Sequence, residues 1–209
     1  MPPPEEILSV LKEIANDWQF LAILWHIYFA VLASVLVLGI RPSMRLVGLG
    51  LVLPLVSVSA LAWASGNPFN GIFFTFSGAA LLFISFRLPR DDIQIAPLWA
   101  KVIGAIMFTF GWVYPHFLET ASFFPYLYSA PTGLIPCPTL SMVIGLSIIV
   151  GSFGVRAWSI VLGLSGTFYG VFGAAHLSVS LDWVLLLGAL AVILTVSKDK
   201  KRDRKHAAI

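Results

Sequence analysis

The sequence predicts an all-α fold, a polytopic membrane helix bundle with about seven transmembrane helices. Of the 209 residues, 58% are apolar and 11% are charged, whereas soluble domains contain roughly 45–50% apolar and about 25% charged residues. The mean hydropathy is +0.92. Because a bilayer core of about 30 Å requires on the order of 20 apolar residues per helix, the chain has little length left for a soluble domain.

Residues 1–16 are predicted to form an amphipathic, interfacial N-terminal helix. Ile7, Leu11 and Ile14 recur at helical spacing, and charged residues occupy the rest of the helix circumference. The transmembrane bundle is expected over residues 17–197, and residues 198–209 form a basic tail. The seven spans are predicted at residues 18–40, 46–64, 69–86, 98–118, 140–153, 157–175 and 181–196.

Basic residues alternate between successive connections, and this alternation predicts how the bundle is oriented. The first, third and fifth connections carry Arg41 and Arg45, Arg87 and Arg90, and Arg156, whereas the second, fourth and sixth carry no Lys or Arg. Cytoplasmic loops of membrane proteins are enriched in Lys and Arg. The N-terminus is therefore expected outside, and the C-terminus with its basic tail is expected in the cytoplasm.

This orientation gathers the reactive side chains in the outer half of the membrane. Ionisable groups inside a membrane are costly and usually face the bundle interior, where they mark functional sites. We therefore expect a substrate or ion site there, with these candidate residues: Cys137, His26, His116, His176, Glu119, Asp182 and Asn67.

The one cysteine of the chain lies between Pro136 and Pro138, just before an apolar segment. The prolines remove two amide donors and free carbonyl groups, and a thiolate prefers soft or borderline cations. With His26 and His116 at similar depth, Cys137 could complete a site for zinc or copper. The alternative is architectural: Cys137 is then a small buried side chain, and Thr139 is the N-cap of the fifth span.

A shift of about 111 residues superposes Arg45 on Arg156, the second span on the sixth, and the third span on the seventh. The match is one of length and hydropathy, so parallel three-helix repeats and uniform span spacing both remain open. The sequence contains no Gly-rich phosphate loop and no intramembrane protease pattern. An enzyme is therefore not the expected class.

Three stretches resemble an uncharacterised bacterial multi-pass membrane family, a domain of unknown function with a Pro-Cys-Pro-Thr motif. They are residues 66–74 (G-N-P-F-N-G-I-F-F), the Tyr114-Pro115 pair, and residues 133–139 (G-L-I-P-C-P-T). The resemblance covers most of the chain. It implies a multi-pass protein of the bacterial inner (cytoplasmic) membrane and supplies no activity.

The expected function is that of a small permease or channel-like protein that handles a small solute or metal ion from the outer face. Cys137, His26 and His116 would contact the ligand, and Glu119 and Asp182 would attract cations at the mouth. One alternative is a membrane redox or accessory subunit in which histidines bind haem or contact a quinone. Another is a structural or assembly factor without a ligand. The expected partners are the lipid bilayer and a homo-oligomer or larger membrane complex, and no nucleic acid is expected.

Overall fold

The computed structural model describes the backbone of residues 3–206 and the side chains of residues 3–194. Over these residues the chain is helical and contains no strand, which confirms the all-α class. The helices are α1 (Pro4–Asp17), α2 (Gln19–Val37), α3 (Met44–Ala64), α4 (Pro68–Arg87), α5 (Leu98–Val113), α6 (Tyr126–Ser129), α7 (Pro136–Ile149), α8 (Arg156–Val171) and α9 (Asp182–His206), with a 3-10 turn η1 (Gly151–Gly154) and a π-helical turn η2 (Phe172–His176).

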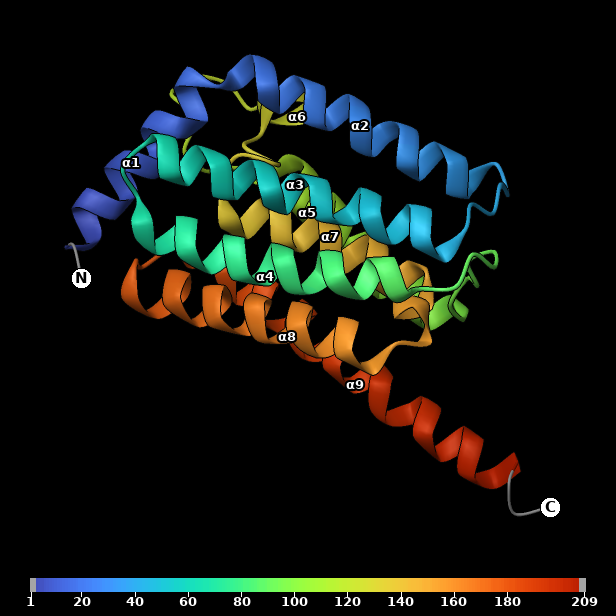
Figure 1. Cartoon of the computed structure of the whole chain (residues 1–209). Coiled ribbons are helices and arrows are strands. Elements are labelled where there is room, and N and C mark those ends of the chain that lie inside the picture. Colours follow the sequence, from blue (N-terminus) through green and yellow to red (C-terminus); the bar gives the residue numbers. More distant parts are fainter. Residues whose placement is uncertain (1–2, 207–209) are drawn as a thin grey trace.

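The long helices α2 to α5 and α7 to α9 lie side by side in one bundle, and α1 packs across one end of it (Figure 1). Three antiparallel pairs make the closest contacts: α3 with α4, α5 with α7, and α8 with α9. Helix α2 lies at the edge of the bundle (Figure 1). We call the end that carries α1 the α1 end and the other the opposite end.

Helix α7 forms the centre, because it packs against α3, α5, α8 and α9, and 12 of its 14 residues are buried. Small residues allow this close packing. A Cβ atom on Gly104 of α5 would lie 2.6 Å from the carbonyl oxygen of Gly145 in α7, and one on Gly111 would lie 2.6 Å from that of Pro138. The α5 and α7 backbones therefore touch directly, as in membrane helices that pack through glycine.

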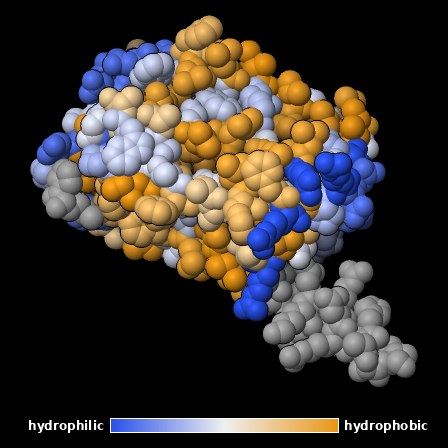
Figure 2. Space-filling view, viewed as in Figure 1, coloured by the Kyte–Doolittle hydropathy of each residue, from blue (hydrophilic) through white to orange (hydrophobic). Residues whose placement is uncertain are grey.

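Four helical segments are long and apolar enough to cross a membrane: α2, α3, α4 and residues Arg156–His176. The apolar helices α5, α7 and Asp182–Leu194 are shorter. The 21 residues of α3 correspond to about 31 Å of helix, the thickness of a hydrocarbon core. Apolar residues cover much of the surface between the two ends of the bundle (Figure 2).

Most predicted helix boundaries agree with the structure to within a few residues, and two differ for identifiable reasons. The predicted span at 98–118 ends at Val113, because Pro115 follows Tyr114 and disfavours helical backbone there. The predicted span at 140–153 is α7, which begins four residues earlier, at Pro136. The side chains of the predicted basic tail, residues 198–209, lie outside the described residues.

Candidate functional site

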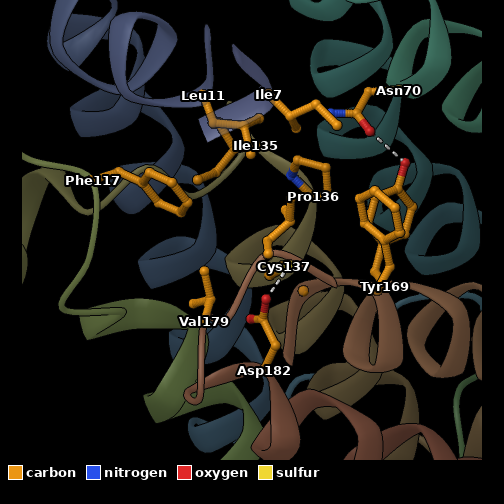
Figure 3. Close-up of a pocket in the computed structure, with 13 residues that line it drawn as sticks. Ile7, Leu11, Asn70, Phe117, Ile135, Pro136, Cys137, Tyr169, Val179 and Asp182 are labelled. Atoms are coloured by element: carbon orange, nitrogen blue, oxygen red, sulfur yellow. Dashed lines mark hydrogen bonds between the residues drawn. The ribbon is translucent and has the colours of Figure 1, made fainter. Parts of the chain in front are cut away.

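A small cavity lies beneath α1, where the ends of α4, α7, α8 and α9 meet (Figure 3). The centre of a water molecule can move within about 20 Å³ of this cavity, so the cavity has room for about one water. Its wall is mostly apolar, with four polar side chains. The lining residues are Ile7, Leu11, Asn70, Phe117, Ile135, Pro136, Cys137, Tyr169, Phe172, Gly173, Leu177, Val179 and Asp182.

The carboxyl group of Asp182 is the polar centre of this site. Tyr114 donates a hydrogen bond from its hydroxyl to Asp182 Oδ1 at 2.7 Å, and the Cys137 thiol donates to Asp182 Oδ2 at 3.2 Å. These three residues, the carboxylate cluster, come from the ends of three helices: Tyr114 follows α5, Cys137 is in the first turn of α7, and Asp182 begins α9. The N-terminus of α9 favours a negative charge at Asp182.

No basic side chain of residues 3–194 balances Asp182. The residue is 1% exposed, and no Lys, Arg or His is among the residues that line the cavity. In the described part of the chain, the one salt bridge joins Lys12 and Glu119. Burying a carboxylate without a counter-charge costs several kcal/mol. The Asp182 carboxylate is therefore stabilised only by neutral hydrogen-bond donors and by the N-terminus of α9. Its negative charge favours the binding of a cation or a proton.

A second polar pair lines the cavity at some distance from the carboxylate cluster (Figure 3). Tyr169 donates its hydroxyl hydrogen to Asn70 Oδ1 at 2.8 Å. Asn70 is 3% exposed, and its amide nitrogen Nδ2 has no hydrogen-bond partner among the described residues. Nδ2 is not among the fully buried side-chain atoms that lack a partner, so it is open to the cavity, where a small molecule would accept its hydrogen bond.

Helix α1 covers the cavity with its apolar face. Ile7 and Leu11 line the cavity, and Ile14 is also buried. Asn16 attaches the end of α1 to the loop after α5: its Nδ2 donates to the Phe117 carbonyl at 2.9 Å, and its Oδ1 accepts from the backbone N–H of residue 119 at 2.9 Å. The predicted amphipathic helix therefore closes the site.

The Pro-Cys-Pro-Thr segment starts a helix and does not interrupt one. Pro136 and Pro138 occupy the first turn of α7, where backbone N–H groups have no partner within the helix, so prolines are tolerated. The expectation that Thr139 is an N-cap is wrong. Thr139 lies inside α7, where its hydroxyl donates to the Ile135 carbonyl at 2.6 Å and accepts from Gly133 N–H at 2.8 Å. These bonds fix the turn that presents Cys137 to the cavity.

Unusual backbone geometry occurs near the cavity and also in η1 at the opposite end, where Ser152 and Phe153 have positive φ angles. Phe117 and Ser178 have positive φ angles of 77° and 58°, a conformation that costs a non-glycine residue of order 1–3 kcal/mol. The π-helical turn η2 brings Gly173 so close to Asp182 that a Cβ atom there would overlap the carboxylate. Strained residues and π-helical turns are both common at functional sites.

Of the residues predicted to form the site, the structure brings Cys137 and Asp182 together. Asp182 was expected at the mouth of the site. It lies inside the bundle instead. Asn67 is the N-cap of α4, where its side chain accepts from the Asn70 N–H at 3.1 Å, so its role is architectural. Glu119 is exposed and pairs with Lys12 at 2.8 Å.

The histidines lie apart from the cavity. Both ring nitrogens of His26 are within hydrogen-bond distance of backbone carbonyls, Nδ1 with Ala22 at 2.8 Å and Nε2 with Trp112 at 3.0 Å. His116 is half-buried in the loop after α5, and His176 is exposed at the end of η2. Among the described residues, no three His, Cys, Asp or Glu side chains could hold a metal ion together. The expected convergence of Cys137, His26 and His116 on a metal is therefore not found.

Three residues of the site were not among the predicted ones: Tyr114, Asn70 and Tyr169. A signal for Tyr114 was present, because the Tyr114-Pro115 pair predicts a helix end next to a polar ring. Asn70 and Tyr169 are ordinary residues of apolar helices, and nothing in their spacing links positions 99 residues apart.

No protein-family model, curated protein or solved structure matches the chain. The family resemblance of residues 133–139 therefore stays a prediction, and function is argued from the site.

Proposed function

We propose that the chain is a seven-span protein of a bacterial inner membrane, with the N-terminus outside and the C-terminus in the cytoplasm. The seven helices α2 to α5 and α7 to α9 run alternately in opposite directions along the bundle. Arg41, Arg45, Arg87, Arg90 and Arg156 lie in or beside connections at the opposite end, as the positive-inside rule requires of a cytoplasmic face. The α1 end, with its cavity, then faces outward.

The function that the site supports best is that of a small permease or channel-like protein that receives a small ion or solute from the outer side. One observation carries this proposal: Asp182 is buried among membrane helices without a basic partner in the described chain. Intramembrane carboxylates are expensive and mark ion or substrate pathways. The cavity volume limits the ligand to very few non-hydrogen atoms.

The geometry speaks against haem binding and thiol redox chemistry as the main role. The nitrogens of His26 already face carbonyl oxygens, so neither is free for an axial haem bond. Reactive cysteines lie beside positive groups that stabilise the thiolate, whereas Cys137 donates to a carboxylate.

The proposal is tested by flux measurements on the purified full chain in liposomes. Proton entry would be followed with an internal pH dye, and steps of NaCl or KCl would be followed as currents on a supported membrane. We expect a flux that Asp182→Asn reduces to the level of protein-free liposomes. Asp92→Asn removes an exposed carboxylate at the opposite end and should leave the flux intact. Equal flux in both variants, or none with any of these ions, would refute the proposal.

A further inference from the structure

We propose that the ion handled by the cavity is the proton, carried by a water molecule and bound by Asp182. This inference rests on the proposed function and deepens it. The carboxylate cluster and the Asn70–Tyr169 pair need different hydrogen-bond partners. Asp182 accepts hydrogen bonds and carries a charge without a counter-charge, so it needs a donor or a proton, whereas Asn70 Nδ2 lacks an acceptor. Water is the small molecule that both donates and accepts, and protonated water delivers the missing charge.

The size and composition of the cavity speak against calcium, magnesium and soft metals. The space accommodates about one water. Calcium requires six to eight oxygen ligands and magnesium an octahedral shell, but the described wall offers one carboxylate, one amide, one phenol and one thiol among apolar side chains. Soft metals lack a third ligand in the described chain. A proton needs only one basic atom, and Asp182 provides it.

The groups around Asp182 are suited to proton transfer. Tyr114 from the end of α5, Cys137 from α7 and Tyr169 from α8 are the titratable side chains that contact it or line its cavity. Each carries one exchangeable hydrogen and can also accept a hydrogen bond. In the binding step, an O–H bond of protonated water breaks and its electron pair remains on the water oxygen, while a new O–H bond forms on Asp182.

The single cysteine makes the proposal directly measurable, because its S–H stretch is the one thiol band of the whole chain. Infrared difference spectra of the full chain in lipid would be recorded as the pH is lowered. We expect a protonated carboxyl band that Asp182→Asn abolishes and Asp92→Asn retains. The S–H band should shift at the same pH, because its acceptor changes from a carboxylate to a neutral acid. Cys137→Ala assigns the thiol band.

One further measurement completes the test. Transfer to D₂O should convert the S–H band to S–D in the folded wild-type protein, because water reaches the cavity. A wild-type S–H band that neither shifts with pH nor exchanges would overturn the inference even if no Asp182 variant folds. Asp182-dependent potassium current without these infrared changes would reject the proton and retain the permease.

Discussion

Replacing Tyr114 by phenylalanine removes one hydroxyl from the carboxylate cluster and leaves the ring in place. The ring is fully buried, and its hydroxyl is the donor at 2.7 Å to Asp182 Oδ1. Hydrogen bonds to charged groups contribute about 1.5–3 kcal/mol, and neutral ones about 0.5–1.5 kcal/mol. Because Asp182 has no basic partner in the described chain, we expect its carboxylate to be charged, and Tyr114→Phe to lower the free energy of unfolding by about 1.5–3 kcal/mol.

Thermal unfolding of the purified protein in one detergent, followed by circular dichroism, measures the effect. For a chain of this size, 1 kcal/mol corresponds to about 2–4 °C, so the midpoint should fall by about 3–12 °C. Tyr169→Phe is the matched control, since its buried hydroxyl donates to a neutral amide at a similar distance of 2.8 Å. If Tyr114→Phe costs no more than Tyr169→Phe, the carboxyl group of Asp182 is uncharged in the folded protein.

Three further perturbations test other parts of the site. Gly173→Ala places a methyl group against the Asp182 carboxylate and should destabilise the protein by about 1–3 kcal/mol. Gly78→Ala is the control: the atom nearest to its new methyl group is 4.0 Å away, so this change should stabilise the protein by about 0.5–1 kcal/mol. Equal midpoints of thermal unfolding for the two variants would contradict the close approach of Gly173 to Asp182. Asn16→Ala breaks two hydrogen bonds that hold α1. Mass spectrometry should therefore show a charged, membrane-impermeant maleimide modifying Cys137 from the outer side about tenfold faster. Modification from the cytoplasmic side alone would reverse the orientation. Burial lowers the pKa of His116 below its ordinary value of 6.5. The unfolded chain therefore binds more protons than the folded one, and the free energy of unfolding should fall as the pH drops below that value. His116→Gln should remove this loss, and a pH profile that does not change in the variant would show that His116 is not responsible.

The sequence predicted the helices well where local signals coincide with hydropathy. Ser43 accepts a hydrogen bond from the N–H of Leu46 at the start of α3, and Asn67 caps α4 just before a proline. Both signals are recognisable from residue types and spacing alone. The fifth span was predicted to begin at residue 140, four residues after the start of α7 at Pro136, because two prolines precede it. Whether a proline breaks a helix or begins it depends on where the first turn lies, which the surrounding packing decides.

The site was predicted only in part, because depth in the membrane does not determine which side chains face one another. Cys137, His26 and Asp182 were all expected in the outer half of the membrane, yet Cys137 contacts Asp182 and not His26. Rotation of each helix about its axis decides such pairings, and it follows from contacts such as that between Gly104 and Gly145. Neither glycine carries a sequence signal for its partner.

The cavity has a consequence for how the protein is assembled. It is covered by Ile7 and Leu11, near the start of the chain, and its carboxylate is supplied by Asp182, near the end. Because a chain is synthesised and inserted from its N-terminus, α1 has to wait for almost the entire bundle before it can dock. The closed cavity therefore forms only after the last helix of the bundle is in place.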